Sequence, residues 1–277
     1  MNDRYTTKAG VMGWPIGHSR SPRLHGYWLN KYGIEGTYEA LAVEPNKLQW
    51  ALREMPSQGF CGVNLTIPHK EAAMKIVDRI DDVAKRIGAV NTVIVGVDGK
   101  LEGRNTDAYG FTQNLMARGV KIKDKPVTVL GAGGAARAVI VALHNMGAGK
   151  IYLLNRTQER AEQLRDILGG AIEVLPWERG EASVKDSGLL VNTTSLGMQG
   201  QPPLEFRIDG LPLEAAVADL VYAPLETDLL RSAHRRGHTT VDGLGMLLHQ
   251  ARPAFQAFFG KDPEVTEQLR SYVLEGK

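Results

Sequence analysis

The sequence has a single cysteine, Cys61, among its 277 residues. One thiol excludes an intrachain disulfide and favours a reducing compartment. Because Cys61 lies in a predicted core strand, we expect a buried and unreactive thiol. The chain also lacks apolar runs of about 18 residues that could span a membrane. Residues 1–8 are polar and have no signal-peptide core. We therefore expect a cytoplasmic protein with no membrane partner.

Several motifs that carry chemistry in other proteins are missing too. The chain has no C-x-x-C, H-E-x-x-H, EF-hand, G-x-S-x-G or G-x-x-x-x-G-K-[ST] pattern. Its seven histidines are scattered without the spacing of metal ligands. The net charge of +2 gives no reason to expect nucleic acid as a partner. These absences disfavour metal-dependent hydrolysis, serine hydrolysis and P-loop ATP chemistry, and we predict no metal site.

The clearest feature that is present is the stretch VTVLGAGGAAR at residues 127–137. Its short apolar run predicts a buried strand, and an alanine-rich helix follows. Gly131, Gly133 and Ala136 complete a G-x-G-x-x-A pattern, which in this order of elements is typical of dinucleotide binding. Gly131 permits a tight turn, Gly133 lets backbone N–H groups approach a pyrophosphate, and Ala136 keeps the helix close to the strand. The positive end of the helix dipole favours phosphate there.

The next apolar run, residues 151–154, indicates which nucleotide binds. NAD-binding folds commonly carry Asp or Glu at its end, where the carboxylate accepts from the ribose 2′-hydroxyl. This chain has Asn155, Arg156 and Thr157 there, with Arg160 one helical turn further on. Guanidinium groups can hold a 2′-phosphate that a carboxylate would repel. The pattern favours NADP; the alternative is an exposed arginine pair on a surface helix.

Alternating strand and helix signals predict an α/β protein with two domains. The first domain covers residues 1–107. A Rossmann-type dinucleotide-binding domain follows at residues 108–242, with strands expected at 127–130, 151–155, 171–174, 188–192, 216–220 and 239–241. Two further helices, one at 243–259 and one from Asp262-Pro263 to residue 274, have no strand of their own. We expect them to pack back onto one of the two domains.

Polar residues recur where the predicted strands of the first domain end. Ser19 and Ser21 lie in a strand-to-helix turn, and Ser21 before Pro22 has the pattern of a helix N-cap. By spacing alone a cap is the better interpretation; binding of a polar small molecule is the alternative. Asn64 and Thr66 project to one side of the strand that ends near Thr66.

Two charged residues lie at expected helix starts. Lys70 falls in the first turn of a helix predicted to begin at Pro68, where a cation opposes the helix dipole. A solvated surface lysine is the alternative. Asp107 lies near the start of another helix, and capping alone would account for it. Between them, Asn91 opens a strand at residues 88–95, and Asp98-Gly99 predicts a two-residue hairpin turn.

Taken together, these segments resemble the shikimate dehydrogenase family, and the resemblance covers nearly the whole chain. It is carried by eight segments in family order: GHSRSP at 17–22, NLTIPHK at 64–70, GAVNT at 88–92, NTD at 105–107, GAGGAA at 131–136, NRT at 155–157, NTTSLGM at 192–198 and GLGMLLHQA at 243–251. The resemblance implies that residues 243–277 complete the first domain, so that the Rossmann domain is an insertion within it. The expected activity is the reversible NADPH-dependent reduction of 3-dehydroshikimate to shikimate, in aromatic amino-acid biosynthesis.

The resemblance also implies roles for particular residues. Lys70 is the expected acid and base, paired with Asp107. The substrate is expected to bind to neutral polar side chains: Ser19, Ser21, Asn64, Thr66, Asn91, Tyr222 and Gln250. NADP is expected to lie against Gly131, Ala132, Gly133, Gly134, Ala135, Asn155, Arg156, Thr157, Arg160, Thr193, Leu220, Gly243 and Met246. The protein is expected to be a monomer or a homodimer.

One residue departs from the family pattern: His69 stands where members often carry Phe. We interpret it as a packing or solvent-facing substitution rather than a catalytic residue. The first alternative function is a quinate/shikimate dehydrogenase of broader specificity. A second is a non-catalytic protein that binds NADP and shikimate, although both Lys70 and Asp107 are present. A third, a folate-dependent dehydrogenase, is disfavoured by the segments at 17–22 and 64–70.

Overall fold

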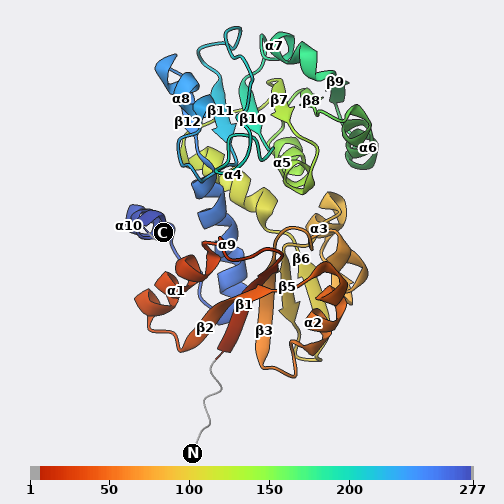
Figure 1. Ribbon diagram of the computed structural model, residues 1–277, viewed down its shortest axis with the longest axis vertical. Helices are drawn as coiled ribbons and strands as arrows, with labels where there is room; N and C mark the ends of the chain where they lie inside the picture. The colour runs from red at the N-terminus through yellow and green to blue at the C-terminus, as the bar shows by residue number, and fades with distance from the viewer. Residues whose placement is uncertain (1–6, 276–277) are drawn as a thin grey trace, which may run out of the picture. The chain divides into compact units, whose positions relative to one another are not determined.

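The computed structural model describes residues 7–275, and the chain divides into two compact units. The first unit consists of Met1–Thr106 and Gln250–Lys277, and the second of Asp107–His249. Each unit contains one six-stranded sheet flanked by helices (Figure 1). The predicted fold class, a two-domain α/β protein whose C-terminal helices return to the first domain, is confirmed.

The sheet of the first unit is mixed and has the order β2-β1-β3-β5-β6-β4. Neighbours β1 and β2, β1 and β3, and β4 and β6 are parallel, whereas β5 runs antiparallel to β3 and β6. The strands are β1 (Thr7–Gly13), β2 (Gly36–Ala42), β3 (Phe60–Leu65), β4 (Arg79–Ile80), β5 (Thr92–Val95) and β6 (Leu101–Arg104).

The helices of this unit cover both faces of the sheet. They are α1 (Ser21–Tyr32), η1 (Pro45–Lys47), α2 (Leu48–Glu54), η2 (Ala72–Lys75), α3 (Asp82–Ile87) and α10 (Glu267–Glu275), together with the end of α9 (Gly243–Phe259). On one face, Trp28 of α1 contacts Phe255 of α9, and its indole N–H donates to Glu264. A Cβ on Gly62 of β3 would collide with Phe258, so α9 lies close against that strand. The C-terminal segment therefore completes one side of this unit.

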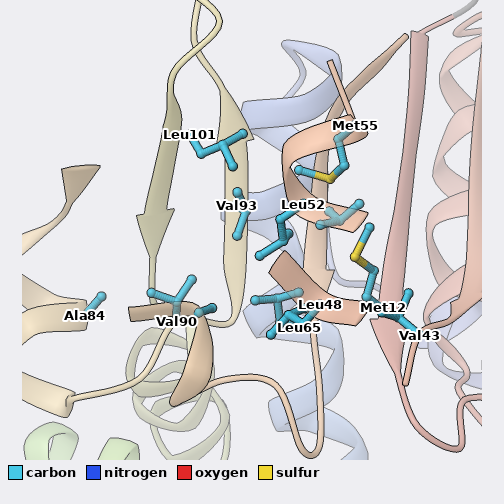
Figure 2. Close-up of a cluster of buried hydrophobic side chains, with 12 residues drawn as sticks. Met12, Val43, Leu48, Leu52, Met55, Leu65, Ala84, Val90, Val93 and Leu101 are labelled. Carbon is cyan, nitrogen blue, oxygen red and sulfur yellow. The ribbon is translucent and has the colours of Figure 1, made fainter. Parts of the chain in front are cut away.

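The opposite face is closed by α2, as Figure 2 shows. Leu52 and Leu48 of α2 pack among buried residues of β1, β3 and β5, including Met12, Leu65 and Val93. Because side chains alternate along a strand, Val63 and Leu65 face this cluster while Gly62 and Asn64 face α9. Because of this alternation, the Asn64 side chain lies on the α9 side of the sheet.

The second unit has the arrangement expected of a Rossmann domain. Its sheet is entirely parallel, in the order β12-β11-β10-β7-β8-β9. The strands are β7 (Val127–Leu130), β8 (Ile151–Leu154), β9 (Ile172–Leu175), β10 (Leu189–Asn192), β11 (Ala216–Asp219) and β12 (Thr239–Val241). The helices are α4 (Asp107–Ala117), α5 (Gly134–Asn145), α6 (Gln158–Leu168), η3 (Trp177–Arg179), α7 (Gly180–Ser183), α8 (Asp228–Arg235) and the start of α9.

The prediction that Pro68 begins a helix was wrong. Residues 67–71 form turns, and only the short 3-10 helix η2 follows. The Asp78 N–H donates to Leu101 of β6, which draws the chain into the sheet before a longer helix can form. Lys70 therefore does not stand in a helical first turn, and the helix-dipole argument does not apply to it.

Three further details differ from prediction. Arg20 is the N-cap of α1, so Ser21 lies inside the helix, while the Ser19 hydroxyl accepts from the Ser21 N–H at 3.3 Å. The last helix begins at Glu267, where the Thr266 hydroxyl accepts from the N–H of Leu269. The β5–β6 hairpin is present, but Gly96 and Gly99 close its turn with a hydrogen bond, so Asp98-Gly99 is not its central pair.

Cys61 is half-buried, and its thiol donates to the carbonyl of Phe258 at 3.5 Å. Burial raises the pKa of this thiol to about 11. Since the thiolate is the reactive form, the predicted lack of reactivity agrees with this environment.

Candidate active site

The glycine-rich turn between β7 and α5 is shaped by close packing. Gly131 has a φ of 104°, which side chains rarely adopt, and a Cβ there would lie 2.7 Å from Oγ1 of Thr193. The Thr193 hydroxyl donates to the carbonyl of Leu130 at 2.7 Å. Thr193, which directly follows β10, therefore stabilises the turn between β7 and α5. The requirement for glycine at this position is therefore steric as well as conformational.

The N-terminus of α5 suits a phosphate. Gly133 is its N-cap, no side chain caps it, and its first turn holds no acidic residue. A Cβ on Gly133 or Gly134 would meet nothing within 4 Å, so open space lies above the backbone there. Backbone N–H groups and the helix dipole can therefore reach an anion. Ala132 and Ala135 complete this turn, and the residues present fit the pyrophosphate of a dinucleotide.

Asn155 joins this turn to the end of β8. Its Oδ1 accepts from the Ala132 N–H at 3.2 Å, and its Nδ2 donates to the carbonyl of Thr157 at 2.7 Å. Arg156 and Arg160 are exposed beside it. Glu159 is the only carboxylate among residues 155–160, and it lies in the first turn of α6. A phosphate on the ribose would thus meet two cations, with one acid nearby.

A buried carboxylate, Asp219, organises the loop that follows β11. It accepts from the N–H of Val221 at 3.0 Å, from Nδ2 of Asn192 at 2.9 Å and from the Thr227 hydroxyl at 2.7 Å. Burial raises the pKa of this carboxyl group, and the three donors oppose that shift. The hydrogen bonds fix the loop that carries Leu220 and Tyr222.

Asp219 was not predicted from the sequence as a residue that shapes the site. An acid at the carboxyl end of a parallel strand, where such sheets bind ligands, was the available signal. The same loop explains why residue 243 is a glycine, because a Cβ there would collide with the carbonyl of Leu220. Met246, half-buried in the first turn of α9, follows it.

In the first unit, Asn91 is the centre of a polar network. Its Oδ1 accepts from the Thr106 N–H and from the Thr92 hydroxyl, both at 2.9 Å. Its Nδ2 donates to the Thr106 hydroxyl at 2.9 Å and to Oε1 of Gln250 at 3.3 Å. Asn91 and Gln250, which are far apart in the sequence, are therefore brought into direct contact.

Asn64 extends this network across the sheet. Its Nδ2 donates to the carbonyl of Asn91 at 3.2 Å and to the Thr92 hydroxyl at 3.0 Å. Its Oδ1 accepts from the hydroxyl of Tyr38 at 2.7 Å. Tyr38, Thr92 and Thr106 were not predicted, because residue type and spacing alone do not distinguish them from ordinary strand and turn residues.

The turn that carries Lys70 is held at several points. The Thr66 N–H donates to the carbonyl of Met12 at 3.0 Å, and the Lys70 carbonyl accepts from the Val90 N–H at 2.8 Å. Between these, His69 is buried, and its Nε2 lies 2.9 Å from the carbonyl of Val43. The buried position of His69 therefore agrees with its interpretation as a packing residue. Its contact with the Val43 carbonyl was not predicted.

The structure thus gathers the predicted residues into two groups. Asn64, Asn91 and Gln250 are linked by hydrogen bonds within the first unit, which also holds Ser19 and Ser21, with Thr66 and Lys70 on the turn that follows β3. The fingerprint turn, Asn155, Thr157 and Thr193 are linked within the second unit, which also holds Tyr222 and Asp107. Asp107 is buried at the first position of α4, where the helix dipole stabilises a carboxylate.

A parallel Rossmann sheet with this fingerprint, next in sequence to a unit with a neutral polar network, defines a two-domain dehydrogenase of the nucleotide-dependent class. Comparison with known proteins identifies the family. Residues 11–93 match the family model of the shikimate dehydrogenase substrate binding domain, and residues 114–197 match that of shikimate / quinate 5-dehydrogenase.

Curated relatives extend this match to nearly the full chain. Shikimate dehydrogenase (NADP(+)) of Paramagnetospirillum magneticum is 54% identical over 269 residues, which cover 96% of this chain and 97% of the relative. That of Rhodospirillum rubrum is 52% identical over 272 residues and covers 96% of both. The chain belongs to the family of NADP-dependent shikimate dehydrogenases, which are oxidoreductases acting on a CH–OH group.

Solved structures show the same fold. Shikimate 5-dehydrogenase of Thermus thermophilus, in complex with NADP(H) and shikimate, has a TM-score of 0.87 at 39% identity and covers 97% of this chain and 98% of that one. Quinate dehydrogenase of Corynebacterium glutamicum, in complex with NAD, has a TM-score of 0.91 at 30% identity, covering 97% and 99%. The fold is therefore shared by enzymes that are named for two substrates.

Among residues 7–275, no helix combines the length and the apolar character needed to cross a membrane.

Proposed function

We propose that this chain catalyses the reversible NADPH-dependent reduction of 3-dehydroshikimate to shikimate. The observation that supports this most strongly is the 54% identity to a shikimate dehydrogenase (NADP(+)) across 96% of the chain. We further propose that residues 1–107 and 243–277 form the substrate domain and residues 108–242 the NADP domain. The protein is proposed to be cytoplasmic, as a monomer or a homodimer.

The cofactor is proposed to lie along the second unit. The N–H groups of the fingerprint turn, from Gly131 to Ala135, would hold the pyrophosphate. Asn155, Arg156, Thr157 and Arg160 would hold the phosphorylated ribose, and Thr193, Leu220, Gly243 and Met246 would lie along the rest of the molecule. When bound, NADP carries the hydride that is exchanged with the substrate carbon.

Lys70 is proposed to handle the proton that accompanies this exchange. In reduction, the Lys70 ammonium group donates a proton to the oxygen that becomes the alcohol, and in oxidation the neutral amine removes it. Asp107 is the proposed partner of the lysine in this role. The fixed backbone at Lys70, whose carbonyl accepts from Val90, supports a positioned rather than a mobile acid.

The remaining residues are suited to a ring that carries several hydroxyl groups. Ser19, Ser21, Asn64, Thr66, Asn91, Tyr222 and Gln250 are neutral hydrogen-bonding groups. Sites built on such groups strongly reject analogues that lack the matching hydroxyl, because buried polar atoms would be left unpaired. This chemistry favours a polyhydroxylated carboxylic acid over a plain hydrophobic alcohol.

The decisive experiment is absorbance of NADPH during turnover of shikimate and of quinate, each with NADP⁺ and with NAD⁺. We expect the highest kcat/KM for shikimate with NADP⁺. Comparable turnover of quinate would favour the broader quinate/shikimate enzyme, for which the fold shared with the quinate dehydrogenase is the supporting observation. Absence of turnover in all four mixtures would overturn the proposal and favour a binding protein.

A further inference from the structure

Tyr38 is joined through its hydroxyl group to Asn64, one of the proposed substrate-binding residues. It lies in the middle of β2, and its side chain is buried. The hydroxyl donates to Oδ1 of Asn64 at 2.7 Å. Asn64 lies near the end of β3. A single phenol therefore ties β2 to a strand that is not its neighbour in the sheet.

The register of the sheet explains how Tyr38 reaches Asn64. Tyr38 of β2 is paired with Ala9 of β1, and Ala9 is paired with Gly62 of β3. The small Ala9 side chain leaves room beside Tyr38 for a ring to extend across β1. Since side chains at alternate positions share a face, Asn64 follows Gly62 on the same side of the sheet. The tyrosine hydroxyl therefore arrives at the amide two residues beyond Gly62.

The hydroxyl determines which way the Asn64 amide points. The two ends of an amide have nearly the same shape but opposite hydrogen-bonding character. Here Oδ1 receives the Tyr38 hydroxyl, and Nδ2 donates to the Asn91 carbonyl and the Thr92 hydroxyl. Both hydrogens of Nδ2 are used within the protein, so a ligand that reaches Asn64 meets an acceptor oxygen. Without the tyrosine hydroxyl, that oxygen loses its fixed donor.

The ring of Tyr38 is itself held from one side. It stacks on the buried ring of His25, with centroids 3.8 Å apart and planes 9° from parallel. A phenylalanine at this position would keep the ring, the stack and the burial. The only atom removed would be the hydroxyl oxygen, which makes Tyr38→Phe a narrow test of the hydrogen bonds.

We propose that Tyr38 is a positioning residue for substrate binding, which holds the Asn64 amide in the orientation that a polyhydroxylated ligand requires. The inference rests on the proposed function for the identity of that ligand. It adds a residue to the site that touches no substrate and acts through Asn64, which is proposed to touch it. Because the hydroxyl group is remote from the reacting carbon, its removal should act on binding more than on the chemical step.

The test is steady-state kinetics of Tyr38→Phe with shikimate and NADP⁺. We expect the KM for shikimate to rise about five- to tenfold, the size of effect that loss of one buried hydrogen bond produces. The KM for NADP⁺ and kcat should each change less than about twofold. Tyr32→Phe is the matched control, because its hydroxyl accepts from the Glu264 N–H in the same unit but lies outside this network. That variant should leave the KM for shikimate unchanged.

A double-mutant cycle separates positioning from a general loss of structure. In an Asn64→Ala background, Tyr38→Phe should raise the KM for shikimate by less than about twofold, because most of its effect passes through Asn64. Equal fold-changes in both backgrounds would overturn the inference, as would an unchanged KM in the single variant. A Tyr38→Phe protein that fails to fold would also overturn it, since the hydroxyl would then serve the fold. If the unaltered protein turns over no shikimate, the proposed function fails instead.

Discussion

The rings of His25 and Tyr38 are stacked face to face, 3.8 Å apart, inside the first unit. His25 is fully buried, and neither of its ring nitrogens has a hydrogen-bond partner among residues 7–275. Burial lowers the pKa of His25 to about 3, because water cannot solvate the charged ring there. The ring is therefore neutral wherever the protein is folded at ordinary pH, and it acts as a flat support for Tyr38.

This neutral histidine predicts a pH dependence of stability. Unfolding restores a pKa near 6.5, so between pH 6.5 and 3 the unfolded chain binds a proton that the folded chain does not. Stability from this group is therefore complete above about pH 6.5 and declines as pH falls, by up to about 1.4 kcal/mol per pH unit. Urea unfolding of the wild type and of His25→Phe should be measured at several pH values. The difference in unfolding free energy between the two proteins should change by up to this amount per pH unit.

The exposed residue His234 provides the control for that experiment. His234→Gln should follow the wild-type pH dependence, because the His234 side chain is exposed to solvent in the folded protein. Curves for wild type and His25→Phe that run parallel from pH 7 to pH 4 would show that His25 takes up its proton in the folded state, and would contradict the assignment.

A second prediction concerns His69, whose Nε2 lies 2.9 Å from the carbonyl of Val43. His69→Phe would keep the volume but leave that buried carbonyl without its donor, which costs about 1–3 kcal/mol. Because His69 directly precedes Lys70, the loosened turn should also lower kcat by a few fold. His69→Gln, which can still donate, should recover part of both losses. Chemical denaturation and kcat of the two variants provide the measurements; a Phe variant that equals the wild type in both would refute this role.

Local patterns predicted the second unit well. The fingerprint depends on residues adjacent in sequence, so the apolar run before Gly131 and the helix after it could be placed from the chain alone. The parallel sheet then followed from the alternation of strands and helices. The same local reasoning failed at Lys70, because the chain after it is drawn toward the sheet by the hydrogen bond from Asp78, just before β4, to Leu101 of β6.

The polar network of the first unit shows a second limit of prediction from local sequence patterns. Asn64, Asn91 and Gln250 were predicted only through the family resemblance, since each alone resembles a turn or cap residue. Tyr38 was not predicted at all. Its importance depends on the small residue Ala9 beside it on β1, and on a register between strands that no local pattern contains. Residues that act through long-range contacts are therefore the ones that the structure adds.

Lys70 carries the third prediction. Lys70→Ala should lower kcat by about 10²–10⁴-fold, the usual contribution of a positioned acid or base, with little change in the KM for shikimate. Lys75→Ala is the control, because Lys75 is an exposed lysine on the neighbouring helix η2. Single-turnover measurements with both variants would confirm that the chemical step is affected. Near-normal kcat in Lys70→Ala would remove the lysine from its proposed role.

The fourth prediction tests cofactor selection at Arg156. Arg156 is exposed directly after β8, where Asn155 fixes the backbone by joining Ala132 to Thr157. A guanidinium group that pairs with a 2′-phosphate makes charge-assisted hydrogen bonds worth about 1.5–3 kcal/mol. Arg156→Ala should therefore raise the KM for NADP⁺ about 10–100-fold while leaving the KM for shikimate nearly unchanged.

Arg165, a partly exposed arginine on α6 that pairs with Asp166, is the matched control for this change. Arg165→Ala should alter neither KM. Because the interaction at Arg156 is ionic and exposed, raising the salt concentration should weaken NADP⁺ binding by the wild type more than by Arg156→Ala. If Arg156→Ala instead changes the KM for NADP⁺ and for NAD⁺ equally, the side chain contributes to dinucleotide binding in general. The preference for the phosphorylated cofactor would then have to come from Arg160 or from the backbone of the loop.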